Sequence, residues 1–227
     1  MIKGCDISEF QGDININALK KSGIKFVIIR IGEDDFVDAR AADNINKCKA
    51  AGLPWGGYWF SDAVDTQTAI KEADLMLNFL KIHNYTPDVG LWYDMENSPV
   101  REGKHFSAEE LANIAYAACE HWENAGYYAG IYCNSYYHSM LYPYCERFDC
   151  WYALWDEDPS YCNVSATIKQ YEVLDTELSP SGELDLDVCY ADLDIYKMQS
   201  FPNNEKQTMK DKIDKIIKEL ENLKNEI

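Results

Sequence analysis

The chain has 227 residues, of which 47% are hydrophobic, and its formal net charge is -18. This length and apolar content are enough for one large domain with a full core. The strong negative charge excludes nucleic acid as a partner and disfavours an anionic membrane surface, and the sequence has no run of about 18 apolar residues that could span a bilayer.

Short apolar runs alternate with amphipathic segments along most of the chain. The apolar runs predict eight strands, at residues 3–7, 25–30, 55–60, 89–96, 128–133, 150–154, 167–171 and 184–189. Helical periodicity predicts four helices between the first five strands, at 14–22, 39–51, 66–82 and 107–125. After Cys133 the helical segments become short and irregular, so we expect loops between the last strands.

The ends of the predicted helices carry clear signals. Ser107 stands at the N-cap of the fourth helix, and Glu110 three residues later completes a capping box. Gly23, Gly52 and Gly126 follow the first, second and fourth helices, where a left-handed C-cap is wanted. Strand–helix alternation of this kind predicts a parallel α/β fold, and eight strands predict a closed TIM-like barrel rather than an open sheet.

The fourth predicted strand, at residues 89–96, ends in Asp94-Met95-Glu96. Side chains alternate along a strand, so positions 94 and 96 would share one face about 6–7 Å apart. Two carboxylates at the end of a buried strand oppose each other's ionisation, and a glycosidase uses such a pair as one acid and one charged group. A solvated strand end is the alternative reading. Asp6 and Asp185 lie at or near other strand ends and could face the same site.

Residues 201–227 form a second predicted region, a linker and an amphipathic helix after a catalytic barrel at 1–200. Its apolar residues have heptad spacing: Met209, Ile213, Ile216, Leu220, Leu223 and Ile227. Residues 203–227 hold six lysines and six acids, so the rest of the chain carries the whole net charge. Two readings stay open, a helix packed on the barrel or a coiled coil that joins copies into a homo-oligomer through residues 205–227.

The eight cysteines show no C-x-x-C pair and no zinc-like spacing with histidine. We therefore expect no metal and no cofactor. Cys5, Cys133 and Cys189 fall inside apolar strand patterns and are predicted to be buried thiols. Cys145 and Cys150 could form a disulfide in an oxidising environment.

Several segments match one family in the order of the chain. Residues 4–14 read G-C-D-I-S-E-F-Q-G-D-I, and residues 93–96 read Y-D-M-E. Further matches are G-Y-W-F at 57–60, G-I-Y at 130–132, W-Y-A-L-W at 151–155, Q-Y at 170–171 and L-D-L-D at 184–187. Together they resemble the family 25 glycoside hydrolases, the lysozymes of the Chalaropsis type, over residues 2 to about 197.

The resemblance implies a barrel of five β/α units followed by three strands lacking regular helices. It also implies a muramidase that hydrolyses the β-1,4 bond between N-acetylmuramic acid and N-acetylglucosamine, with peptidoglycan glycan strands as its partner. No signal peptide is visible at the N-terminus. We therefore expect release of a phage endolysin by a holin, or secretion of a bacterial lysozyme whose leader has been removed, with action on the cell wall.

The resemblance also implies roles for individual residues. Glu96 would be the general acid, and Asp94 would stay charged and orient the substrate's 2-acetamido group. Asp6 and Asp185 match the family's further acids, which would position the site and tune Glu96. The residues predicted to contact sugar are Tyr58, Phe60, Tyr132, Trp155 and Gln170. The expected separation of the carboxyls leaves the stereochemical outcome open.

Some positions depart from the family pattern, and alternatives remain. Trp59 stands where histidine is usual, Trp155 where tyrosine is usual, and Asp187 where asparagine is common. On purely structural readings, Asp6 would cap the turn before Ser8 and Gln170 would bond only to backbone at the rim. A chitinase-like or other β-glycosidase on a similar barrel is one rival function, although the longer D-x-x-D-x-D-x-E run is absent. A non-catalytic glycan-binding relative is the other, and the presence of all four acids speaks against it.

Overall fold

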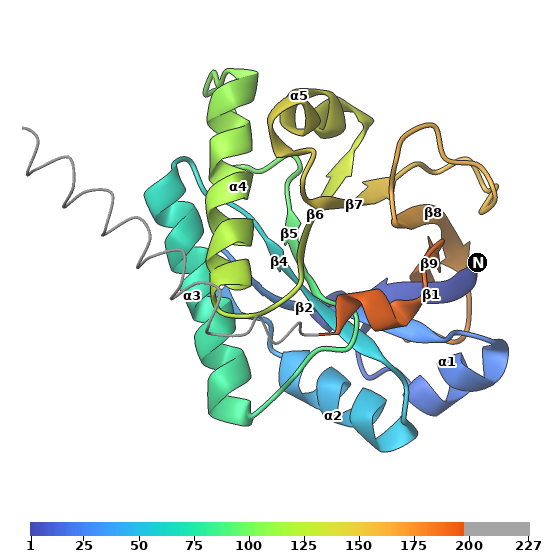
Figure 1. The fold of residues 1–227 in the computed structure, drawn as a ribbon. Helices are drawn as coiled ribbons and strands as arrows, with labels where there is room; N and C mark the ends of the chain where they lie inside the picture. The colour runs from blue at the N-terminus through green and yellow to red at the C-terminus, as the bar shows by residue number, and fades with distance from the viewer. Residues whose placement is uncertain (198–227) are drawn as a thin grey trace, which may run out of the picture.

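Eight strands close into a barrel in the computed structural model, which describes residues 1–197 (Figure 1). Their bounds are β1 (Ile2–Ile7), β2 (Phe26–Glu33), β4 (Trp55–Phe60), β5 (Leu91–Asp94), β6 (Ala129–Asn134), β7 (Asp149–Ala153), β8 (Ile168–Asp175) and β9 (Glu183–Cys189). Their order around the barrel is β1-β9-β8-β7-β6-β5-β4-β2, and pairing of β1 with β2 closes it. A short strand, β3 (Phe36–Val37), pairs antiparallel with the end of β2. The predicted closed barrel is confirmed.

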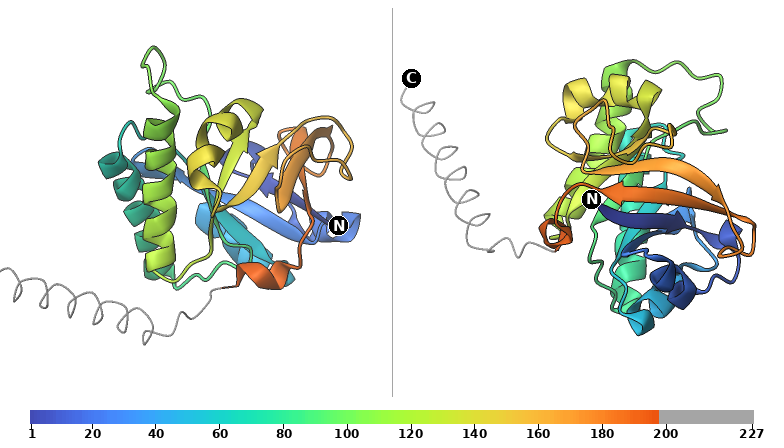
Figure 2. Two further views of the ribbon diagram at one scale, coloured as in Figure 1. Left: turned by 45° about the horizontal axis from the view of Figure 1, so that its top comes forward. Right: turned by 90° about the vertical axis from the view of Figure 1, so that its right-hand side faces the viewer.

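Five helices follow the first five barrel strands. They are α1 (Ile16–Ser22), α2 (Ala41–Ala51), α3 (Thr66–His83), α4 (Ala108–Asn124) and α5 (Ser135–Cys145). Two 3-10 helices, η1 (Glu9–Gln11) and η2 (Leu193–Tyr196), complete the described elements. Residues 149–189 contain no helix, and β1, β8 and β9 face the viewer in the right-hand view of Figure 2. Five β/α units followed by three strands lacking regular helices are therefore confirmed.

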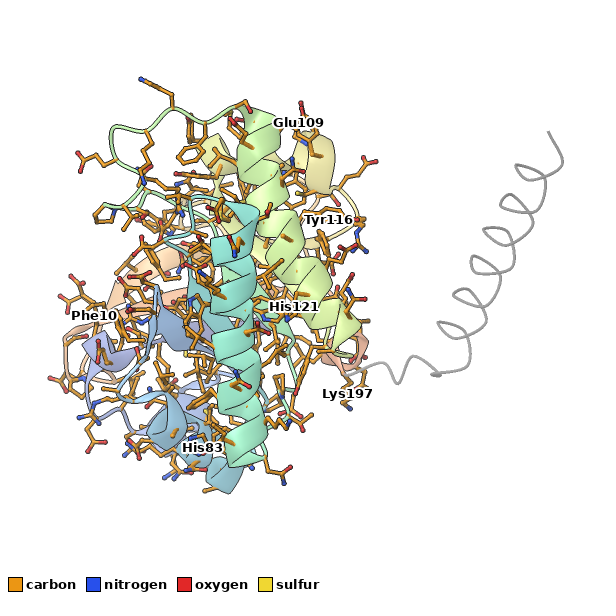
Figure 3. All side chains as sticks on the ribbon, turned by 90° about the vertical axis from the view of Figure 1, so that its left-hand side faces the viewer. Phe10, His83, Glu109, Tyr116, His121 and Lys197 are labelled. Carbon is orange, nitrogen blue, oxygen red and sulfur yellow. The ribbon has the colours of Figure 1, made fainter. Side chains whose placement is uncertain are left out.

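Helices α3 and α4 lie side by side along the outside of the barrel (Figure 3). The indole Nε1 of Trp122 on α4 donates to the carbonyl oxygen of Ala73 on α3 at 3.1 Å. Nearer the surface, Nε2 of His121 lies 2.7 Å from Oδ1 of Asp74. These contacts fix α3 against α4, and both helices cover the outer face of β5.

Strand β9 runs antiparallel to both of its neighbours, β8 and β1. The prediction of parallel strands is therefore wrong for β9. Residues 176–182 connect β8 to β9 and are too few for the crossover that parallel neighbours need. As a consequence, the beginning of β9 lies at the same mouth of the barrel as the ends of the parallel strands.

Alternation along the strands separates two apolar cores. Outward side chains pack under the helices, and inward side chains form a smaller core inside the barrel. The inner core consists of Phe26, Ile28, Val89, Trp92, Tyr132, Trp151, Ile168, Cys189 and Tyr196. The rings of Trp92 and Trp151 meet edge to face with centroids 6.1 Å apart. The inner core is therefore filled largely by aromatic rings, with Trp92 one inward position before Asp94 on β5.

Two glycines make room for these rings. A Cβ atom at Gly130 would come within 2.3 Å of the Trp92 ring, and a Cβ atom at Gly4 would come within 2.3 Å of the Phe26 ring. Gly4 is also the first glycine of the G-x-D pattern that ends at Asp6. That glycine therefore serves packing inside the barrel rather than a turn.

The predicted start and stop signals of the helices are confirmed. The Ser107 hydroxyl accepts from the backbone N–H of Glu110 at 3.2 Å, and the Glu110 carboxylate accepts from the backbone N–H of Ser107 at 2.8 Å. Gly23, Gly52 and Gly126 have φ angles of 107°, 59° and 94°, the left-handed region expected at C-caps.

Other local features differ from the sequence prediction. Strand β5 begins after Gly90, whose φ is 72°, and ends at Asp94. Glu96 was predicted to be part of this strand, but it lies two residues beyond its end. Residues 135–145 form a helix, α5, where we expected a short irregular segment. Its many tyrosines and Pro143 give the sequence no clear helical pattern of apolar residues. All eight cysteines are free thiols, so Cys145 and Cys150 are not bridged.

Among residues 1–197, no helix combines the length and the apolar character needed to cross a bilayer. The predicted amphipathic helix and oligomer contact at 201–227 lie outside the described residues. That part of the predicted domain organisation stays a prediction.

Candidate active site

The four predicted acids lie at one mouth of the barrel. Asp6 is near the end of β1, and Asp94 is the last residue of β5. Asp185 lies near the start of the antiparallel β9, where it is the direct cross-strand partner of Asp6. Glu96 follows two residues after the end of β5. The reversed direction of β9 is what brings Asp185 to this mouth.

Tyr132 on β6 shows how closely the acids converge. It is the register partner of Asp94 on the neighbouring strand β5. Burial raises the pKa of its phenol, and the negative charges that add to this effect are those of Asp94, Glu96, Asp6 and Asp185. All four acids therefore lie close enough to the Tyr132 phenol for their charges to act on it.

Gln170 on β8 joins the acids to the aromatic residues. Its Nε2 donates to Oδ2 of Asp6 at 2.8 Å. Its Oε1 accepts from the Tyr132 hydroxyl at 2.8 Å and from the Trp155 indole N–H at 3.0 Å. Gln170 therefore bonds to side chains and not only to backbone at the rim. Asp6 likewise points at Gln170 and does not cap the turn at Ser8, which caps η1 with its own side chain.

Asp94 and Glu96, the D-x-E pair, lie two positions apart where β5 ends. Asp94 is only 4% exposed, and burial followed by the charge of Glu96 raises its pKa well above the ordinary value. Arg101 and Arg30 oppose this shift. Glu96 is partly exposed, and burial also raises its pKa, with Arg101 again opposing and Asp185 adding to the rise. The charge of Glu96 therefore disfavours ionisation of the buried Asp94, and Arg101 counteracts the rise in pKa at both carboxyls.

Asp6 on β1 and Asp185 and Asp187 on β9 form a second group of acids. Burial and the charges of Asp185 and Asp187 raise the pKa of Asp6, while its bond from Gln170 opposes the rise. Burial raises the pKa of Asp185 to about 6. Asp187 is fully buried, and its Oδ1 accepts from the Trp151 indole N–H at 2.8 Å. Protons are therefore retained on this group at pH values where free aspartates have lost theirs.

Sequence reasoning missed Arg30, which faces the same mouth from β2. Its Nε donates to Oδ2 of Asp38 at 2.8 Å, and its other nitrogens contact Glu33 at 2.9 Å and Glu9 at 3.2 Å. The sequence does contain a signal for this residue, because Arg30 is the one charged side chain inside the apolar run at residues 26–31. Its charge favours ionisation of Asp94.

The predicted sugar-contacting aromatics surround the acids. Phe60 is the register partner of Asp94 on β4, opposite to Tyr132. Tyr58 lies one inward position earlier and packs edge to face on Trp151, with centroids 5.8 Å apart. Trp155 is 64% exposed although its indole N–H is held by Gln170. A ring anchored at its edge keeps a face free for the apolar side of a sugar.

A cavity of about 520 Å³ lies beside the segment that follows Glu96 in the chain. It is lined by Asn97, Ser98, Pro99, Arg101, Glu102 and Tyr137. The wall of this cavity therefore comes from the loop after β5 and from α5.

Comparison with known proteins relates this geometry to a family. The sequence matches the model of the glycosyl hydrolases family 25 over residues 5–176. No curated protein matches the sequence.

Three solved structures illustrate the similarity of fold. The modular autolysin LytC from Streptococcus pneumoniae, solved in complex with a synthetic peptidoglycan ligand, is 23% identical with a TM-score of 0.73, and the match covers 83% of this chain and 46% of the autolysin. A family 25 glycosyl hydrolase from Bacillus anthracis is 23% identical with a TM-score of 0.71, with 87% and 94% covered. The catalytic domain of the endolysin ply40 from bacteriophage P40 of Listeria monocytogenes is 20% identical with a TM-score of 0.72, with 85% and 95% covered.

The chain thus spans about half the length of the autolysin and nearly all of the other two proteins. The structural matches show the fold, and the family match extends over most of the chain. The chain belongs to the glycosyl hydrolases family 25.

Proposed function

We propose that this protein is a lysozyme, a 1,4-β-N-acetylmuramidase that cleaves the bond between N-acetylmuramic acid and N-acetylglucosamine in peptidoglycan. The observation that carries the proposal is the convergence of four acids around Tyr132 at one mouth of the barrel. Membership of family 25 supports it, and so does the similarity in fold to an autolysin solved with a peptidoglycan ligand. Peptidoglycan glycan strands are the proposed partner.

In this proposal Glu96 is the general acid. Its carboxyl is the more exposed of the D-x-E pair, so it can reach the glycosidic oxygen. Its raised pKa keeps a proton available near neutral pH. As the glycosidic bond breaks, Glu96 gives this proton to the leaving oxygen, and it recovers a proton from the water that completes hydrolysis.

Asp94 is the charged member of the pair. The charges of Arg101 and Arg30 oppose the rise in its pKa that burial and Glu96 cause, whereas Arg101 opposes the rise at Glu96. Oδ1 of Asp94 is buried without a hydrogen-bond donor among the described residues. The N–H of the substrate's 2-acetamido group would supply that donor. The acetamido oxygen would then attack the anomeric carbon, and Asp94 would stabilise the positive charge that develops.

The remaining acids and aromatics hold the substrate and the pair. The charge of Asp185 helps to keep the Glu96 carboxyl protonated, and Asp6 is held in place by the amide of Gln170. Tyr58, Phe60, Tyr132 and Trp155 offer ring faces and hydroxyl groups to the sugars, with Gln170 fixing two of them.

The decisive experiment is digestion of purified bacterial cell walls followed by identification of the new reducing sugar. A muramidase leaves muramic acid at the reducing end, whereas a glucosaminidase leaves glucosamine. Glu96→Gln should lower the rate by at least about 100-fold, because the amide cannot donate the proton. Glu109→Gln is the matched control, since Glu109 is exposed at the start of α4 (Figure 3).

Two results would overturn the proposal. Faster digestion of chitin than of cell walls would favour a chitinase-like enzyme. Tight binding to cell walls without any release of reducing ends would favour a glycan-binding protein that does not turn over.

A further inference from the structure

A buried polar cluster lies behind the D-x-E pair, outside the barrel and against α3. Its members are Ser61 after β4, Glu72 on α3, Tyr93 on β5 and Arg101 in the loop after β5. All are at most 5% exposed, and the outer core around them is apolar. The proposed chemistry uses none of them directly. Buried polar side chains cost free energy unless they are paired, so the cluster needs an explanation.

Arg101 ties the segment that carries Glu96 to the loop after β4. One terminal nitrogen of its guanidinium donates to the backbone carbonyl oxygen of Glu96 at 2.5 Å. The other donates to the carbonyl oxygen of Ala63 at 3.2 Å and lies 3.5 Å from the Ser61 hydroxyl. Strand β5 ends at Asp94. The side chain of Arg101 therefore bonds to backbone beyond the point where the strand stops.

Glu72 anchors the same region from α3. Its Oε1 accepts from the backbone N–H of Asp62 at 3.0 Å, and its other oxygen accepts from the Tyr93 hydroxyl. The Ser61 hydroxyl donates to the Tyr93 oxygen at 2.8 Å. Tyr93 directly precedes Asp94 in the chain. The cluster thus holds both Tyr93, before the acids, and the backbone of Glu96 at their end.

The charge of Arg101 acts on both acids of the pair. Its positive charge is the largest influence that opposes the rise in the pKa of Glu96 caused by burial. It is also the largest that opposes the rise in the pKa of Asp94. Burial also raises the pKa of Glu72 to about 7, and Arg101 opposes that rise too. Arg101 is 5% exposed, so solvent screens its charge only weakly.

We propose that Arg101 is a positioning residue that fixes Glu96 beside Asp94 and supplies the positive charge that lets one carboxyl of the pair ionise. The inference rests on the proposed hydrolase function. Ser61 lies 3.5 Å from the guanidinium, and its hydroxyl is held in turn by Tyr93, which bonds to Glu72. Arg101 touches the backbone of Glu96, so it acts through Glu96 and not on the sugar.

The test compares Arg101→Gln with Arg101→Lys by the pH dependence of kcat/KM on soluble peptidoglycan fragments. Loss of the positive charge leaves both carboxyls harder to ionise, so Arg101→Gln should shift the bell-shaped profile to higher pH by about one unit. It should lower kcat about tenfold or more with little change in KM, because the acid is no longer held in place. Arg101→Lys keeps the charge and should keep the position of the profile, with a smaller loss in kcat because one ammonium replaces a two-armed guanidinium.

Arg147→Gln is the matched control, since Arg147 is 43% exposed and pairs with Glu123 on the far side of α4. An Arg101→Gln enzyme with an unshifted profile and unchanged kcat would overturn the inference. Inactive wild-type protein would instead count against the proposed function. In that case, the carboxyl ¹³C signals of Asp94 and Glu96 can be titrated in wild type, Arg101→Gln and Arg101→Lys, with Glu72→Gln as a further variant. This measurement follows the ionisation of both carboxyls without any substrate. Identical titration of Asp94 and Glu96 in wild type and Arg101→Gln would overturn the inference without any turnover.

Discussion

Gln170 shows how one neutral side chain can organise several titrating groups. It faces Asp6 with its amide nitrogen and faces Tyr132 and Trp155 with its amide oxygen. An amide can donate and accept at once without adding charge, which a carboxylate cannot do. In a mouth that already holds four acids, this neutrality lets the aromatic residues be oriented without a further rise in repulsion.

Asp187 is a buried aspartate whose negative charge would lower the stability of the folded protein. It is fully buried, its Oδ1 accepts from Trp151, and its Oδ2 has no donor within residues 1–197. Burial raises its pKa in the folded protein. Well below pH 4 the side chain is protonated in both the folded and the unfolded chain and carries no penalty. As the pH rises further, only the unfolded chain loses the proton freely, so the folded protein loses stability.

We therefore expect Asp187→Asn to stabilise the protein in a pH-dependent way. Its free energy of unfolding should exceed that of wild type by about 1–3 kcal/mol at pH 7–8, with a difference near zero at about pH 3. Urea unfolding at both pH values measures this difference. Asp175→Asn, at an exposed position of β8, is the control and should show no such trend. A stability change of the same size at both pH values would contradict the argument.

At the scale of elements, the loop between β7 and β8 is held by a lysine that no solvent reaches. Lys169 is fully buried on β8. Its ammonium group donates to the carbonyl oxygens of Asp158 at 2.8 Å and Tyr161 at 2.7 Å, and it also bonds to the Asp156 carboxylate. These three bonds use all three N–H groups of the ammonium. Because the same loop carries Trp155, Lys169 fixes the loop on which a proposed sugar-stacking ring depends.

Lys169→Met should uncouple this loop. It removes a buried cation and leaves two carbonyls and a carboxylate without their donor, so we expect a loss of about 2 kcal/mol or more in the free energy of unfolding. On soluble peptidoglycan fragments KM should rise several-fold with a smaller change in kcat, because the loop carries a proposed sugar-stacking ring and none of the four acids. Lys25→Met, at an exposed site before β2, should change neither quantity. A variant with the wild-type KM would show that the loop keeps its shape without the ammonium.

The periodic elements could be predicted from sequence because their signals are local. Strand alternation, capping boxes and C-cap glycines depend on residues within a few positions of each other, and the eight strands and first four helices follow from them. The direction of β9 depends instead on how the chain returns after Asp175, and the end of β5 depends on which backbone groups β6 offers. These are properties of the closed barrel and have no local signature.

The same distinction applies to the site. The acids Asp94 and Glu96 could be found because the motif is contiguous, and Asp6 and Asp185 because the resemblance carries them. Arg101 and Glu72 read as ordinary surface charges on an amphipathic segment and a loop. Their burial depends on partners about 20 to 40 positions away in the chain. A single sequence does not reveal such pairings.

The whole molecule carries a net charge of -18, which bears on how it meets its proposed substrate. Stem peptides of peptidoglycan carry carboxylates, so protein and wall repel each other at low ionic strength. Salt screens this repulsion, with a screening length that falls from about 30 Å at 0.01 M to about 8 Å at 0.15 M.

Digestion of intact cell walls should therefore accelerate several-fold when salt is raised from about 10 to 150 mM. The rate on a short uncharged glycan should stay nearly constant over the same range. A rate on cell walls that falls as salt is added would mean that local positive charge, rather than the net charge of the molecule, governs the encounter with the wall.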